Sequence, residues 1–215
     1  MDASGLARLK TLAVALLLAL AAPAVVGQSS SSIMGSPHDF STRGWGSDQI
    51  CIFCHTPHNA ALNMVVPLWN HAVTSQTFTL YSSANSSTFS ATSSQPEGVS
   101  KLCLSCHDGT VAIDSFGSRT GANRMDNNSR NLGIDLRNDH PVSFTFDSAL
   151  VTADARGGPA QLAVPVSEQE VVPEVPLFQG KVECATCHNA HNNTYGTFLR
   201  VSNTASALCL RCHIK

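Results

Sequence analysis

The sequence predicts a chain that is mostly coil, with short helices, a few short strands and bound cofactors in place of a large apolar core. Three observations predict this. The 215 residues include only nine Phe, two Trp and two Tyr. The stretch Thr74–Gln95 is mostly small and polar. All eight cysteines fall into four copies of one C-x-x-C-H motif. Such a chain has too little apolar side-chain surface to fold around that surface alone.

The N-terminal segment is typical of an export signal. Arg8 and Lys10 precede an apolar run at Leu12–Ala22, and small residues follow it. The run is shorter than the roughly 20 residues of a membrane-spanning helix, so we expect residues 1–27 to be a cleaved signal peptide. An uncleaved N-terminal anchor is the alternative. The remainder, residues 28–215, is expected to form one exported domain. Its weakly acidic charge argues against a nucleic-acid partner.

The four cysteine motifs predict covalently attached haem c, because C-x-x-C-H is its attachment signature. Disulfides would explain paired cysteines in an exported chain but not the histidine after each pair. Zinc would favour cysteine pairs grouped into four-ligand sites and gives no reason for that histidine. We therefore expect four haems, each bound through two thioethers and one proximal iron ligand. The attachment residues are Cys51, Cys54, Cys103, Cys106, Cys184, Cys187, Cys209 and Cys212, and the proximal ligands are His55, His107, His188 and His213.

Further histidines are candidates for the opposite side of each iron. His58 and His191 each follow a motif histidine by three residues. Three residues cannot carry the chain around a porphyrin edge, so each of these histidines would have to bind the iron of another haem. His38 and His140 each precede a pair of motifs. These four are the distal candidates, and His71 is the histidine left over.

The same order occurs twice along the chain and predicts two dihaem units, about 38–116 and 138–215, within the single domain. Each unit has a leading histidine, then C-x-x-C-H-x-x-H, then L-C-L-x-C-H. Every haem can then have two imidazoles. Six-coordinate iron has no position for a substrate, so electron transfer at low potential is expected instead of enzymatic catalysis.

Local patterns place a few elements. The two L-C-L-x-C-H motifs are expected on short helices, the second running from a cap at Thr204 to about His213. Alternation in residues 142–146 predicts a half-buried strand. Residues 123–139 are predicted to be a solvated loop; calcium binding there is the less favoured interpretation. Four prolines indicate an extended connector in residues 157–176.

The order of these motifs resembles that of OmcE-type tetrahaem outer-surface cytochromes. The resemblance rests on SPHDFS, CIFCHTPHNA, PLWN, LCLSCHDGTVA, NDHPVSF, CATCHNAHN and LCLRCH, from His38 to His213. It implies a mostly coil fold and subunits that polymerise into extracellular filaments with a continuous haem stack. It also implies that a histidine of one subunit completes a haem of the next, and His58 is the matching residue. His71 after PLWN departs from the family pattern.

The resemblance implies three kinds of partner: other copies of the chain, cytochromes that donate electrons, and extracellular electron acceptors. A soluble periplasmic tetrahaem carrier is the main alternative, because it would use the same haems and ligands. A multihaem reductase is a third interpretation and would need one iron without a distal histidine. Electron microscopy separates the first two, and the spin state of the haems tests the third.

Overall fold

The computed structural model describes residues 33–62, 64, 66–156 and 158–214, and its chain is mostly coil. The predicted signal peptide lies outside the described residues. The fold class predicted from the sequence is confirmed, because the described helices and strands are few and short. They are α2 (Gly98–His107), β1 (Phe144–Thr145), α3 (Ser148–Ala155), β2 (Glu170–Val172), β3 (Val175–Pro176), β4 (Lys181–Val182), α4 (Cys184–Cys187), η2 (Thr204–Ser206) and η3 (Cys209–Arg211).

The predicted helix at the second motif is confirmed as α2, which ends on the motif histidine, His107. The amide of Asp108 donates to the carbonyl of Leu104, and Gly109 follows with a φ of 72°. Glycine adopts this left-handed conformation without steric cost, so the chain turns away immediately after the motif.

The prediction of one regular helix at residues 204–213 is wrong. The structure has two separate 3-10 turns, η2 and η3, and Ala205 within η2 has a φ of 53°. Thr204 is the first residue of η2 and not its cap. The residue before it, Asn203, instead accepts a hydrogen bond from the amide of Leu208 (3.2 Å), which ties the two turns together.

Two small antiparallel sheets hold the C-terminal half together. Strand β1 pairs with β4, with Phe144 opposite Val182, and β2 pairs with β3, with Val172 opposite Val175. The predicted strand at 142–146 is therefore shorter than expected. Its alternation also fails at Ser143, which is fully buried and has a φ of 58°. The loop prediction for 123–139 is confirmed, since no helix or strand is assigned there.

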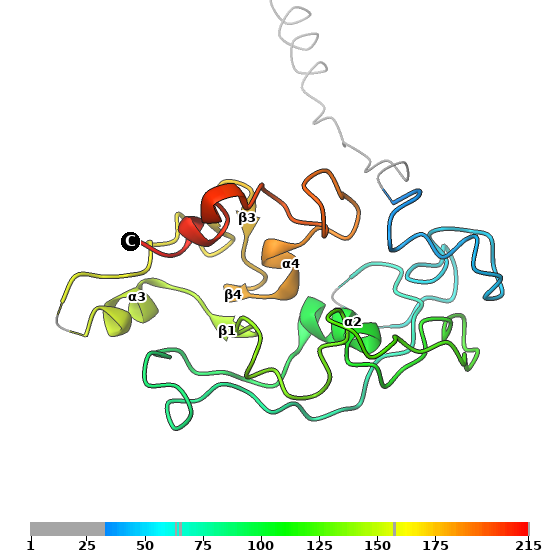
Figure 1. The fold of residues 1–215 in the computed structure, drawn as a ribbon, viewed down its shortest axis with the longest axis horizontal. Helices are drawn as coiled ribbons and strands as arrows, with labels where there is room; N and C mark the ends of the chain where they lie inside the picture. Colours follow the sequence, from blue (N-terminus) through cyan, green and yellow to red (C-terminus); the bar gives the residue numbers. More distant parts are fainter. Residues whose placement is uncertain (1–32, 63, 65, 157, 215) are drawn as a thin grey trace, which may run out of the picture.

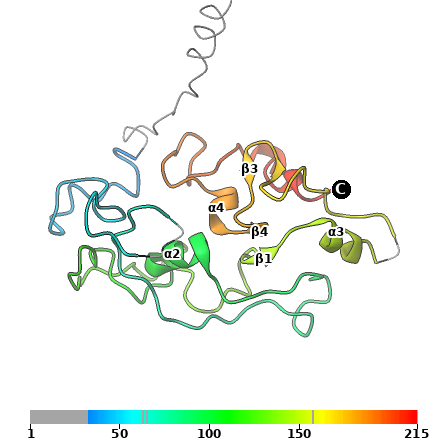
Figure 2. The same cartoon turned by 180° about the vertical axis from the view of Figure 1, so that it is seen from behind.

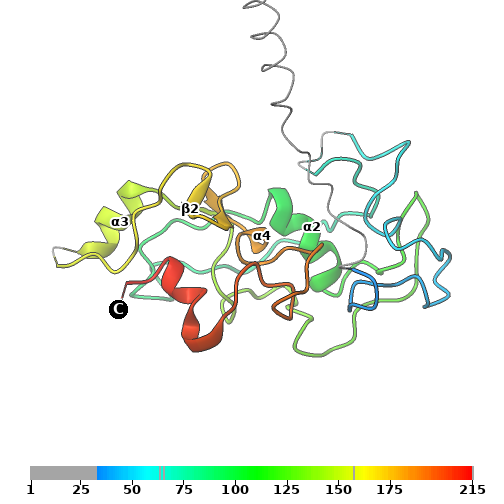
Figure 3. The same ribbon diagram turned by 90° about the horizontal axis from the view of Figure 1, so that it is seen from above.

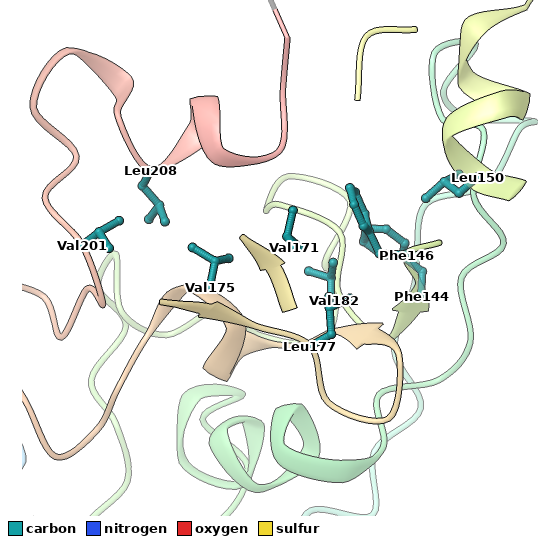
Figure 4. Packing of buried hydrophobic residues seen from close by; sticks show 9 residues of the cluster. All are labelled: Phe144, Phe146, Leu150, Val171, Val175, Leu177, Val182, Val201 and Leu208. Carbon is teal, nitrogen blue, oxygen red and sulfur yellow. The ribbon is translucent and has the colours of Figure 1, made fainter. Parts of the chain in front are cut away.

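Apolar side chains form separate small clusters in the described part of the chain. The larger one packs between the two sheets and the C-terminal turns (Figure 4). A smaller one joins Phe78, Leu104 and Leu136 beside α2. Small clusters agree with the expectation that side chains alone do not fill the centre. The larger cluster contains Phe144, Phe146, Leu150, Val171, Val175, Leu177, Val182, Val201 and Leu208.

The four cysteine motifs lie in sequence order along the long axis of the molecule (Figure 1). The N-terminal part with the first motif occupies one end, α2 and α4 are central, and the C-terminal turns with the fourth motif lie beyond them. Helices α2 and α4 contact each other and are side by side in the views from behind and above (Figures 2 and 3). Among the described residues, no helix has the length and apolarity to cross a bilayer.

Candidate haem-binding sites

Each C-x-x-C-H motif forms a single helical turn. The amide of the motif histidine donates to the carbonyl of the first cysteine in three of them, at 2.8 Å for His55, 3.0 Å for His188 and 2.9 Å for His213. The remaining motif forms the last turn of α2. Residues three and four apart share one face of a helical turn. This turn therefore presents both thiols and the imidazole to the same side, as attachment to one haem requires.

The third motif shows how the sequence sets this turn. Helix α4 is one turn long and begins with a capping box, in which the Thr186 hydroxyl accepts from the Glu183 amide (2.9 Å) and the Glu183 side chain accepts from the Thr186 amide. The helix ends at His188, whose backbone is extended. The capping box fixes the short turn without a longer helix to support it.

Backbone carbonyls orient the motif histidines. The Nδ1 atom of His55 lies 3.0 Å from the carbonyl of Pro67, and those of His107 and His188 lie 2.8 Å from the carbonyls of Arg130 and Thr197. A carbonyl only accepts, so Nδ1 carries the hydrogen in each case. The Nε2 lone pair is then directed away from these carbonyls, which is the usual arrangement of a metal-binding histidine with a backbone partner. The residues present fit haem attachment.

Three motif histidines each face one distal candidate. The ring centres are 6.0 Å apart for His55 and His191, with planes inclined at 24°. Metal–imidazole bonds are about 2.0 Å long and the ring centre lies about 1.1 Å beyond the nitrogen, so two imidazoles on opposite sides of one iron have centres about 6.2 Å apart. The other two pairs are His38 with His107 (6.2 Å, 65°) and His140 with His213 (6.4 Å, 72°).

Within the described chain, His58 and His188 form no such ring pair with another histidine. His58 is an exposed residue of the loop that follows the first motif. The structure thus brings together three of the four predicted distal histidines with three motif histidines. Iron ligation by all of these histidines stays a prediction.

His71 differs from the ligand candidates. It is 4% exposed, and both ring nitrogens contact carbonyls, with Nδ1 2.6 Å from Ala72 and Nε2 3.1 Å from Ala112. Its backbone also bridges to Phe116. Protein atoms thus lie against both nitrogens, including the Cys106 sulfur 3.6 Å from Nε2, and a neutral ring can donate to only one of the two carbonyls. His71 links two coil segments, and its exclusion from iron ligation stays a prediction.

Burial favours the neutral form of two distal candidates, His38 and His191, and metal binding requires that form. Burial and the neighbouring His107 charge lower the pKa of His38 to about 4. Phe198 stacks on the same ring, with centres 4.2 Å apart, and a backbone hydrogen bond joins His38 to Ala190. Burial likewise lowers the pKa of His191. Contacts with Phe198 and Ala190 were not expected from sequence, because neither residue carries a motif.

Thiols of consecutive motifs lie close together. A hydrogen bond between Cys103 and Cys184 raises the pKa of Cys103 and lowers that of Cys184, so the second and third motifs meet directly. The amide of Cys184 also donates to the Ser100 hydroxyl in α2 (2.9 Å). Burial raises the pKa of Cys212 to about 11. The motifs therefore form one series along the chain and not four separated sites.

The comparison with protein families supports the interpretation of these motifs. Residues 176–215 match the family described as the doubled CXXCH motif, and this range covers the third and fourth motifs. The match indicates covalently bound haem c and supports a multihaem c-type cytochrome in electron transfer. Cytochromes of this type are typically exported. The comparison with curated proteins finds no match.

Proposed function

We propose that this multihaem c-type cytochrome carries four haems, each with two imidazole ligands, and conducts electrons along them as the subunit of an extracellular filament. The observation that carries the proposal is the set of three histidine ring pairs, whose separations of 6.0–6.4 Å suit two ligands of one iron. Four complete C-x-x-C-H motifs supply the attachment sites. Two strong ligands on each iron favour electron transfer over substrate binding.

The protein contributes position and rigidity to electron transfer. Bound haem supplies the iron that changes between the ferric and ferrous states. The backbone carbonyls of Pro67, Arg130 and Thr197 hold three imidazoles in one tautomer and orientation. Ligands fixed in this way need little rearrangement when the charge on the iron changes. The direct contact between Cys103 and Cys184 brings the second and third attachment sites close together, which favours transfer between their haems.

Polymerisation is proposed from the loop that follows the first motif. His58 is exposed there and has no histidine ring partner among the described residues. Two exposed apolar side chains lie in the same loop, Leu62 at 86% and Leu68 at 51%. A loop that exposes both a nitrogen ligand and apolar side chains suits docking onto a second copy of the chain. A contact between two different surfaces of identical subunits need not close, and it then produces a filament.

Electron microscopy of the natively exported, haem-loaded protein tests this proposal. We expect long thin filaments from the wild type and from Pro57→Ala, a matched change in the same exposed loop. His58→Ala is expected to give single subunits with the same haem content. Filaments from His58→Ala would show that His58 is not the joining ligand. Monodisperse wild-type particles at high concentration would favour the alternative function, a soluble periplasmic electron carrier.

A further inference from the structure

The ring pairs follow a rule that the two dihaem units share. The leading histidine of each unit faces the second motif of its own unit. In the first unit this pair is His38 with His107, and in the second it is His140 with His213. The two pairs also have similar geometry, with separations of 6.2 and 6.4 Å and interplanar angles of 65° and 72°. The units therefore complete their second haem sites in the same way.

The trailing histidines follow a different rule. His191 trails the first motif of the second unit, yet it faces His55, in the first motif of the preceding unit. A first motif is thus completed by the unit that comes after it. The first motif of the second unit contains His188, which forms no ring pair with another histidine within the described residues. In an assembly, the first unit of another copy supplies a further trailing histidine, His58.

We propose that the iron held by His188 has only this one imidazole in the free chain and in the last subunit of each filament, where it binds small neutral ligands such as carbon monoxide or free imidazole. Inside a filament His58 of the next copy takes that place. The inference rests on the proposed role of His58 as the joining ligand. Beyond that role, the inference identifies the iron that His58 binds and a ligand-binding site at one end of the filament.

Assembly and ligand binding then exclude each other, because both need the same coordination position. Carbon monoxide binds ferrous haem without any change in oxidation state, by forming one iron–carbon bond. A haem with two protein imidazoles has no position for it. The amount of carbon monoxide bound per chain therefore counts the irons that lack a second imidazole.

The test uses full-length, haem-loaded His58→Ala, reduced and titrated with carbon monoxide under optical detection. One bound molecule per chain is expected, and His58→Ala/His191→Ala is expected to bind two, because the second change frees the His55 iron. Free imidazole should reduce binding by His58→Ala without producing filaments. Intact wild-type filaments and Pro57→Ala filaments should bind far less per chain, and shearing them should increase binding as new ends form.

To place the site, Cys184→Ala/Cys187→Ala is added to His58→Ala, with a low-spin spectrum of the other three haems as the check on folding. Loss of carbon monoxide binding in that protein supports the assignment, and retained binding overturns it. If His58→Ala stays unassembled and binds no carbon monoxide, the assignment of an open position to the His188 iron is refuted. The joining role of His58 is not affected by that result. His58→Ala that still forms filaments would instead refute the joining role itself.

Discussion

His55 and His191 come from opposite halves of the chain, yet their ring centres lie 6.0 Å apart with planes inclined at 24°. No sequence neighbour supplies this contact, because each residue belongs to a different dihaem unit. The contact links the first motif to the loop after the third. Since the separation matches two ligands of one iron, His191 is expected to control the spin state of the haem at the first motif.

His191→Ala should convert that haem alone from low-spin to high-spin iron, because it loses one of two strong ligands. Electron paramagnetic resonance of the oxidised protein measures this change. The matched control is His71→Gln, which replaces the buried histidine whose nitrogens both contact carbonyls. An unchanged low-spin spectrum in His191→Ala, or a high-spin signal in His71→Gln, would contradict the assignment.

Cys51→Ala/Cys54→Ala should lower the intact mass by the mass of one haem beyond the two side-chain changes. The reason is that both thioether bonds at the first motif are lost. Intact-protein mass spectrometry of the wild type is expected to show four haems, one for each motif. A variant that retains the wild-type haem content would show that the first motif is not an attachment site.

Glu183 predicts a pH dependence of stability. The residue is 3% exposed, and its carboxyl accepts a hydrogen bond from the Ser143 hydroxyl (3.0 Å). Burial raises its pKa above the ordinary 4.5, against the effect of Ser100, Ser143 and Lys181. The folded state thus holds this proton more tightly than the unfolded state. The stability that this group contributes is present below pH 4.5 and is lost as the pH rises through the folded-state pKa.

Glu183→Gln removes this titration while keeping an oxygen for the serine hydroxyls. The free energy of unfolding of the variant, relative to that of the wild type, should therefore increase as the pH rises from 4.5 through the raised folded-state pKa of Glu183. Denaturant unfolding followed by circular dichroism at each pH measures the difference. A difference that stays constant with pH, or changes in the opposite direction, would refute the raised pKa.

The larger apolar cluster should contribute strongly to stability despite its size. Phe146 is 3% exposed within it, so Phe146→Ala should lower the free energy of unfolding by about 3–5 kcal/mol. The exposed Val166 gives a matched control, since Val166→Ala should change it by no more than about 0.5 kcal/mol. Denaturant unfolding at constant haem content compares the two. Equal effects would mean that bound haem, and not this cluster, determines stability.

The coil-rich fold could be predicted from sequence because few aromatic residues and many small polar residues limit the apolar surface. Helix α2 was also predictable, since the L-C-L-x-C-H motif was expected on a short helix. The regular helix expected at 204–213 was not found, because Ala205 adopts a left-handed conformation that no local sequence pattern indicated. The local hydrogen bond from the Leu208 amide to Asn203 and the packing of Leu208 in the larger apolar cluster determine that segment instead.

The candidate site was likewise predictable from the sequence only in part. The C-x-x-C-H spacing identifies attachment residues and motif histidines locally. Pairing of the distal histidines is non-local, so sequence gave four candidates but not their partners. The carbonyls of Pro67, Arg130 and Thr197 are main-chain atoms, so the types of these residues do not show that they bind the motif histidines. The contact of Cys103 with Cys184 likewise depends on how α2 packs against α4.

The most direct test of the account is a high-resolution cryo-electron microscopy structure of the assembled, haem-loaded protein, in which the two axial ligands of each iron are identified. We predict His55 with His191, His107 with His38, His213 with His140, and His188 with His58 of the next subunit. An iron with a different pair of ligands, or a His188 iron completed from within its own chain, would contradict the account.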